Sequence, residues 1–202
     1  MKIRRPAAFT LIELLTVIAI ISLLAALLFP ALGAAQRSAV RAKTKVQFVQ
    51  WAASVEAFRT EYGYYPAFDV SGLVNGGVTQ TDHLFHDLLA ARKRDGSALA
   101  ATDSAALQNR KRIVLHSFGV DEIDAGGLVR DASENTVIAV LVDRDLDGVI
   151  RVGTDLAALP AVGGAAPGTA DFPTAGVRAG VVFYAPAPGS TAANPEFVMS
   201  WK

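Results

Sequence analysis

A long apolar run near the N-terminus constrains this chain more than any other feature. Between Phe9 and Phe29 the only charged residue is Glu13, and the basic residues Lys2, Arg4 and Arg5 precede the run. As a helix, about 21 residues at about 1.5 Å each extend roughly 30 Å, which matches the hydrocarbon core of a bilayer. The sequence therefore predicts a membrane-spanning helix at 9–29.

The charges on the two sides of this run bear on its orientation. The basic residues before it favour a cytoplasmic N-terminus, because Lys and Arg are retained on the cytoplasmic side of membranes. Four basic residues also follow the run and weaken that preference: Arg37, Arg41, Lys43 and Lys45. Charge alone thus supports the orientation only in part.

Two simpler interpretations compete with a functional membrane helix. The run could be a cleaved secretory signal, with Ala31 and Gly33 as a poor cleavage site, or a plain single-pass anchor. Neither interpretation accounts for Glu13, because a carboxylate in a membrane helix costs up to about 2.5–3.5 kcal/mol at the bilayer centre. Such a residue indicates a partner charge.

The sequence around the start of the run carries a specific motif. Residues 8–15 read AFTLIELL and follow a short basic leader, residues 1–8. This segment resembles the processing site of type IV prepilins and of type II secretion pseudopilins. The resemblance implies cleavage between Ala8 and Phe9 by a membrane-embedded prepilin peptidase, N-methylation of Phe9, and assembly into a helical filament. The family usually has Gly where Ala8 stands.

Glu13 has a physical role in that scheme. Cleavage would create an α-amine on Phe9, which is largely cationic at neutral pH because its ordinary pKa is near about 8. In the low dielectric of a helix bundle, the amine of one subunit can neutralise Glu13 of a neighbour. We therefore expect Phe9 and Glu13 to act in assembly. The alternative is that Glu13 simply lies at the level of the lipid headgroups.

A second stretch of helix is expected beyond the membrane run. Pro30 removes a helical hydrogen bond and predicts a kink or a local loosening. Apolar residues then recur at spacings of three and four, which predicts one narrow apolar face: Phe48, Trp51, Val55, Phe58 and Tyr62. Gly63 is typical of a residue just past a helix end. We expect helix from about Phe9 to Tyr62, with 30–63 as its amphipathic continuation.

The end of this helix carries a weaker resemblance. Residues 58–66, which read FRTEYGYYP, are similar to the junction after the long helix of major pseudopilins, where a Tyr-Pro pair begins a variable loop. A helix terminator followed by an extended X-Pro step would produce the same pattern. Next, the sequence predicts a short surface helix from Asp82 to about Lys93, capped by Asp82.

The rest of the chain, residues 64–202, is predicted to be one globular domain with an antiparallel sheet. Five stretches are rich in β-branched and aromatic residues: Arg112–Phe118, Val137–Val142, Val149–Val152, Val177–Tyr184 and Phe197–Trp201. An Ala/Gly/Pro-rich loop is expected at 158–173. The expected fold class is α+β, a pilin-like lollipop in which the long N-terminal helix packs on a small sheet.

One acidic cluster lies between two of these predicted strands. Asp143, Asp145 and Asp147 alternate along the chain and are followed by Gly148. Alternating carboxylates before a glycine can direct several oxygens toward one Ca²⁺. An EF-hand does not fit, because Thr154 stands where a bidentate Glu is required. The alternative is a β-hairpin in which Asp147 and Gly148 form the turn.

Composition and the remaining polar residues argue against other functions. Nineteen basic residues balance nineteen acidic ones, so no global field favours nucleic acid. The chain contains no cysteine, which removes thiolate chemistry. His83 and His86 beside Asp87 are a weak candidate for metal binding, and His116 is isolated. No catalytic pattern is visible, so we do not expect an enzyme.

Three classes of function follow from these expectations. The first is a pseudopilin of type II secretion, in the inner membrane with its C-terminal domain in the periplasm. Its expected partners are copies of itself, other pseudopilins, the prepilin peptidase, the inner-membrane assembly platform, and lipid before assembly. The second is a pilin of a surface fibre for adhesion, motility or DNA uptake. The third is a secreted or anchored periplasmic domain, starting near Ala34 if it is released by signal peptidase.

Overall fold

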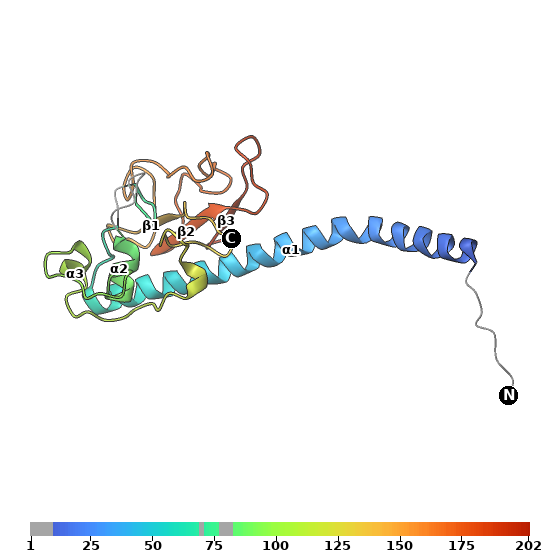
Figure 1. The fold of residues 1–202 in the computed structure, drawn as a ribbon. Coiled ribbons are helices and arrows are strands. Elements are labelled where there is room, and N and C mark those ends of the chain that lie inside the picture. Colours follow the sequence, from blue (N-terminus) through green and yellow to red (C-terminus); the bar gives the residue numbers. More distant parts are fainter. Residues whose placement is uncertain (1–9, 69–70, 77–82) are drawn as a thin grey trace, which may run out of the picture. The chain divides into compact units, whose positions relative to one another are not determined.

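The computed structural model describes residues 10–68, 71–76 and 83–202. The leader, the predicted cleavage position Ala8 and the predicted assembly residue Phe9 lie outside the described residues. By its internal contacts the chain divides into two compact units, of which the first ends at Ala39 and the second is Val40–Lys202. Helix α1 (Leu11–Tyr62) contributes to both units and is continuous across Pro30 (Figure 1).

In the first unit, α1 exposes its large apolar side chains. This holds for the described residues from Leu11 to Leu32, including Leu14, Ile18, Leu24 and Leu28. By length and composition the helix can cross a membrane. The predicted membrane span is therefore a helix whose described apolar side chains are not buried by other residues of this unit.

In the second unit, the predicted apolar face of α1 forms the core. Phe48, Trp51, Val55 and Phe58 are completely buried. Trp51 contacts Phe85 of helix α2 (Leu84–Ala90) edge to face, with ring centroids 5.6 Å apart. The narrow helical face predicted from the sequence is confirmed, because its aromatic side chains meet the rest of the domain.

A three-stranded antiparallel sheet completes this core. Strands β1 (Ala139–Val142), β2 (Val181–Pro186) and β3 (Phe197–Met199) lie in the order β1-β2-β3 (Figure 1). Ala139 pairs with Tyr184, and Tyr184 pairs with Met199. The α+β architecture, with a long N-terminal helix and a small antiparallel sheet, is thus confirmed.

Both faces of the sheet are buried, and each face packs in a different apolar cluster. Val140, Val142 and Phe183 pack in the same cluster as the α1 aromatics. On the other face, Leu141 and Tyr184 pack with residues of the irregular segment between β1 and β2. Successive residues of a strand point to opposite faces, so each strand supplies both clusters.

Two predicted strands are wrong. Residues 112–118 form no strand: the backbone N–H groups of Leu115 and His116 both donate to the carbonyl oxygen of Leu89, at 2.8 and 3.1 Å. The last carbonyls of a helix have no partner within the helix, so the end of α2 takes these donors instead of a neighbouring strand. Residues 149–152 form only two isolated bridges, between Ile150 and Val177 and between Val152 and Leu156.

The predicted hairpin around the acidic cluster is also wrong. Val142 pairs with Val181, and Ile150 pairs with Val177. The stretches that end at Val142 and begin at Ile150 therefore both pair with the segment 177–181. Residues 143–149 form an insertion opposite the three residues 178–180 of that segment. The turn at Asp147 and Gly148 does not reverse the chain into a hairpin, because the partner strand comes from more distant sequence.

The predicted surface helix is shorter and more buried than expected. Helix α2 begins at Leu84 with His83 as its N-cap residue, and the predicted cap Asp82 lies outside the described residues. Phe85, Leu88 and Leu89 are buried in the main cluster. A second short helix, α3 (Ser104–Gln108), was not predicted.

Candidate functional site

The start of α1 contains the residue expected to act in assembly. Thr10 donates to the Glu13 carboxylate through both its backbone N–H, at 2.8 Å, and its hydroxyl, at 2.7 Å. The backbone N–H of Glu13 lies 3.3 Å from the Thr10 hydroxyl oxygen. This is the reciprocal capping box of a Thr-x-x-Glu sequence. The Thr-x-x-Glu pattern at residues 10–13 is a sequence signal for this cap.

The capping box leaves Glu13 on an exposed apolar surface. Leu11, Ile12 and Leu14 beside it are exposed. The predicted ionic partner is the amine of Phe9, which lies outside the described residues. Within the single chain the carboxylate is satisfied by Thr10, and its role between subunits stays a prediction.

The helix ends in the junction that the second resemblance pointed to. The N–H of Gly63, at a positive φ of 81°, donates to the carbonyl oxygen of Arg59 at 2.7 Å, which closes the last turn. The Tyr65 hydroxyl then donates to the Glu56 carboxylate at 2.7 Å. A Cβ at Gly180 would meet the Tyr65 hydroxyl at 1.6 Å, so Tyr65 packs directly against the chain leading into β2.

The acidic cluster is the second predicted site, and the structure brings its carboxylates together. One oxygen from each of Asp143, Asp145 and Asp147 lies within 4.8 Å of the others, with Asp143 buried and the other two exposed. Opposite ligands of one Ca²⁺ are about 4.6–5.2 Å apart, since each Ca–O distance is about 2.3–2.6 Å. The donor set therefore fits a hard cation.

The same carboxylates also organise the loop by themselves. Asp143 accepts hydrogen bonds from the backbone N–H groups of Asp147 and Gly148, at 3.2 and 2.8 Å. Gly148 has a positive φ of 86°. Asp147 pairs with Arg151, and this contact lowers the pKa of the Asp147 carboxyl. These contacts are compatible with a cation site and also with a loop that is held by its own hydrogen bonds, whereas the hairpin expected as the alternative is not formed.

Asp155 belongs to this loop, although the sequence did not single it out as a site residue. It is buried, and its two carboxylate oxygens accept from the backbone N–H groups of Arg144 at 2.7 Å and Arg151 at 2.8 Å. It therefore ties the two ends of the insertion together. The pKa of the Asp145 carboxyl is raised by desolvation, by its hydrogen bond with Asp143, and by the charges of Asp147 and Asp155.

The histidine candidates do not converge on a metal site. His86 Nδ1 lies 2.8 Å from the Asp87 carboxylate, whereas His83 Nδ1 lies 2.9 Å from Arg94 Nη1. A guanidinium cannot be deprotonated in proteins, so Arg94 places a positive charge beside His83. Among the described residues, the only potential ligand cluster is that of the three aspartates.

A polar network that the sequence did not predict links α1 to the short 3₁₀ helix η1 (Val120–Glu122). The Glu122 carboxylate accepts from Trp51 Nε1 at 2.7 Å and from the backbone N–H of Gly119 at 2.8 Å, and His116 Nε2 lies 3.2 Å away. Burial would raise the pKa of Glu122, but the hydrogen bonds and the neighbouring histidine outweigh it and lower the pKa to about 2.

Ser54 joins this network without forming a reactive centre. Its hydroxyl lies 3.4 Å from His116 Nδ1 and donates to the carbonyl oxygen of Gln50 at 3.0 Å. The side chain is buried on the core side of α1. The sequence indicated that His116 is isolated. In the structure it is instead part of a contact that holds residues 116–122 on the helix.

Comparison with known families agrees with the motif at the N-terminus. Residues 3–29 match the family described as the prokaryotic N-terminal methylation motif. This is the type IV pilin-like prepilin signature, and it implies processing by a prepilin peptidase and pilus-like assembly. Residues 3–29 therefore carry a prepilin-type signature, which supports a type IV pilin-like subunit. No curated protein and no solved structure matches it.

Proposed function

We propose that this chain is a pseudopilin, a structural and non-catalytic subunit of the short filament of a type II secretion system. The observation that carries the proposal is the methylation motif at residues 3–29, placed on a helix whose apolar side chains are exposed. An exposed apolar helix is stable only in lipid or against other helices. The absence of cysteine and the Tyr65-Pro66 junction favour a pseudopilin.

In this proposal the mature chain begins at Phe9. Its amine neutralises Glu13 of a neighbouring subunit, which exchanges the Thr10 contacts of the single chain for an ion pair in the filament. Before assembly the helix lies in the inner membrane, with the second unit in the periplasm. The prepilin peptidase, other pseudopilins and the inner-membrane platform are the partners that this route requires.

The alternative is a pilin of a surface fibre, which shares the same N-terminal chemistry. We would first determine the intact mass and the N-terminal fragment spectrum of the protein from its native membrane. A chain that begins at Phe9 with one added methyl supports the proposal, whereas a start at Met1 or near Ala34 contradicts it. Deletion of the gene then separates the two filaments: loss of secreted proteins indicates a pseudopilin, and loss of surface fibres indicates a pilin.

We also propose that the insertion after β1 takes Ca²⁺. Asp143, Asp145 and Asp147 would be its ligands, because their oxygens converge within 4.8 Å. The cation would hold the exposed carboxylates of a loop that already depends on Asp143 and Asp155. Binding would stabilise the folded domain without any catalytic role.

A further inference from the structure

The sheet of the second unit has an open edge at β3. Within the part of the chain that the structure describes, β3 has a strand neighbour on one side only, because the strand order is β1-β2-β3. An edge strand presents backbone N–H and C=O groups that no other strand takes, and these groups are a template for pairing with a further chain. The edge of β3 is therefore a place where another strand can add to the sheet.

Two residues of β3 direct their backbone groups to this edge. The carbonyl oxygen of Glu196 and the backbone N–H of Ser200 bond to β2 and the residue after it, at 2.8 and 3.0 Å. Bonded positions alternate along an antiparallel pair, so Val198 between them also faces β2. The N–H and C=O groups of Phe197 and Met199 consequently point away from β2, toward the open edge.

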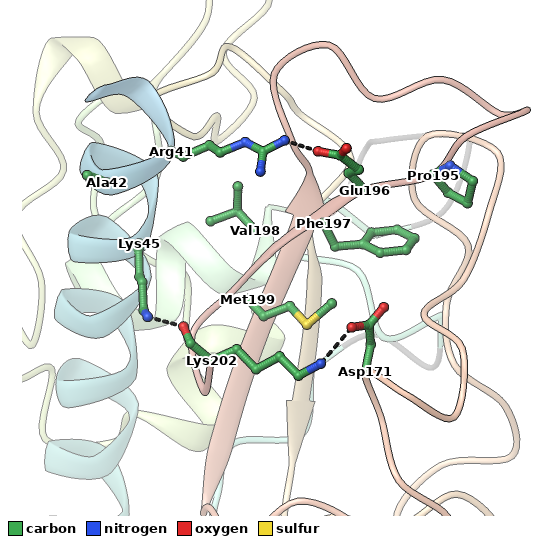
Figure 2. A pocket seen from close by; sticks show the side chains of 10 residues that line it. All are labelled: Arg41, Ala42, Lys45, Asp171, Pro195, Glu196, Phe197, Val198, Met199 and Lys202. Atoms are coloured by element: carbon green, nitrogen blue, oxygen red, sulfur yellow. Dashed lines mark hydrogen bonds and ion pairs between the residues drawn. The ribbon is translucent and has the colours of Figure 1, made fainter. Parts of the chain in front are cut away.

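A groove of about 520 Å³ lies at this edge (Figure 2). Arg41, Ala42 and Lys45 of α1 form one wall. Residues of β3 from both faces of the sheet also line it: Val198 packs in the cluster of the α1 aromatics, and Met199 packs in the other apolar cluster. A hollow that borders both faces of a sheet lies beside its edge, so the groove gives access to the outward backbone groups.

The charged side chains around the groove are held only by exposed contacts. Arg41 pairs with Glu196, and these side chains are 41% and 50% exposed. Lys202 Nζ lies 2.6 Å from the Asp171 carboxylate, and Lys45 Nζ donates to the carbonyl oxygen of Lys202. Exposed ion pairs contribute little to stability. A partner with suitable charges can therefore replace these contacts at low cost.

The chemistry of the groove selects an extended peptide that carries an acidic residue. The outward groups of Phe197 and Met199 match the backbone of an added strand, whereas a metal ion or a small anion would leave them unpaired. A side chain opposite Val198 on that strand lies on the α1 face of the sheet. Arg41 and Lys45 line the groove there, one helical turn apart, so a carboxylate at this position meets two basic groups.

A second copy of this chain fits the edge poorly. Three basic side chains line the groove against two acidic ones, so pairing two β3 edges would bring an excess of positive charge together. In such a pair, β3 would also offer no carboxylate opposite Val198, because its residues are Phe, Val and Met. The occupant that the groove favours is therefore a different protein.

We propose that the β3 edge binds an extended segment of a different protein as a fourth, antiparallel strand of the sheet. Two alternate residues of the segment exchange backbone hydrogen bonds with Phe197 and Met199, and an acidic side chain between them contacts Arg41 and Lys45. This interaction involves the second unit alone, so it goes beyond the assembly of the membrane helix and does not rest on it.

Binding of a designed peptide to the full chain in detergent micelles tests this proposal. The probe is fluorescein-labelled Thr-Val-Glu-Val-Thr, whose valines would lie opposite Phe197 and Met199 and whose glutamate would lie opposite Val198. We expect a saturable rise in fluorescence anisotropy. N-methylation of both valines should weaken binding at least about tenfold, because it removes two backbone donors and keeps every side chain. Hydrogen exchange resolved to single amides should slow at Phe197 and Met199 but not at Val198.

A charge exchange tests the contribution of α1. Lys45→Glu should weaken binding of the glutamate peptide about fivefold, and it should strengthen binding of Thr-Val-Lys-Val-Thr by a similar factor, because an exposed ion pair changes sign. Lys43→Glu is the matched control, since it makes the same change at an exposed residue of α1 that does not line the groove. It should leave the affinity for both peptides nearly unchanged.

The proposal is overturned by any of three results: no saturable binding, an affinity that ignores N-methylation, or unchanged exchange at Phe197 and Met199. Equal effects of the two lysine variants would overturn the assignment of the acidic residue to Arg41 and Lys45. The mass of the processed N-terminus tests the proposed function separately, so each hypothesis can fail while the other stands.

Discussion

Along α1, the large apolar side chains of the first unit are exposed, whereas the aromatic side chains of the second unit are buried. Leu24 and Leu28 are exposed, but Phe48 and Trp51 are completely buried a few turns later. The first stretch is apolar all round, whereas the second carries its aromatic side chains at spacings of three and four on one face. We therefore expect α1 to contact lipid or other subunits up to Ala39, whereas from Val40 onward it packs into the core of its own domain.

This difference separates assembly from folding. The second unit closes its core with residues of its own chain, so changes there should act on stability. The first unit leaves its surface for lipid or other subunits, so changes there should act on assembly. Each prediction below tests this separation.

The largest effect is expected at Glu13. Glu13→Leu should abolish incorporation into filaments, because the Phe9 amine of a neighbour would be buried without a counter-charge. The melting temperature of the second unit, measured by calorimetry of the full chain in detergent, should not change. The sheared filament fraction reports incorporation.

A matched control distinguishes the intersubunit role of Glu13 from its role in the capping box. Thr10→Val removes the hydroxyl that bonds to Glu13 but keeps the carboxylate. We expect this variant to assemble, with at most a reduced yield. Equal loss of filaments in both variants would show that Glu13 acts only as a helix cap.

The second effect is expected in the core of the domain. Trp51→Ala should lower the free energy of unfolding by about 3–5 kcal/mol, because it leaves a large cavity among Phe48, Phe85 and Phe183. The exposed neighbour Val49 provides the control, and Val49→Ala should change stability by less than about 0.5 kcal/mol. Similar losses in both variants would contradict the assignment of one buried and one outer face.

The third effect is a pH dependence from Glu122. Its pKa is about 2 in the folded chain, below the ordinary value of 4.5, so its ionised form stabilises the fold above pH 4.5. This contribution is lost as the pH falls from about 4.5 to about 2 and should amount to about 1–2 kcal/mol once solvent screening is included. Thermal unfolding between pH 2 and 6 measures it. Glu122→Gln should lower stability at pH 6 and flatten the profile, and an unchanged profile would exclude this role.

The smallest effect is expected from calcium. With a dissociation constant of about 10⁻⁴–10⁻³ M, as in extracellular modules, 1 mM Ca²⁺ should stabilise the domain by about 0.4–1.4 kcal/mol. Calorimetry with Ca²⁺ and with a chelator measures this shift. Asp145→Asn should abolish it, because Asp145 is an exposed proposed ligand. Equal melting with and without Ca²⁺ would favour the self-supporting loop.

Local patterns in the sequence predicted the elements whose signals come from nearby residues. The buried face from Phe48 to Phe58 and the helix end at Tyr62 follow from spacing over a few residues, and the structure confirms both. The apolar run before them is also helical, and its position in a membrane stays a prediction. The apolar stretches of β1, β2 and β3 were also identified, although each strand is shorter than predicted. The three aspartates of the loop were found because they alternate along five consecutive positions.

The partners of these elements were decided by the tertiary structure. Val142 and Ile150 pair with residues of one distant segment rather than with each other, and Leu115 and His116 bond to the end of α2 instead of a strand. The pairing partner of each segment depends on which apolar or hydrogen-bonding surface lies closest in space. A short sequence pattern does not encode that distance.

The sequence by itself therefore determined that the chain has a prepilin-type motif on a long apolar helix, an amphipathic continuation of that helix and a small β-rich domain. Only the tertiary structure brought the Glu122 carboxylate to Trp51 Nε1 and to Gln47 Nε2. The physical reason is the range of the interactions. Helix periodicity and capping act over three or four residues, whereas these contacts join residues more than 70 positions apart, which only the folded chain brings together.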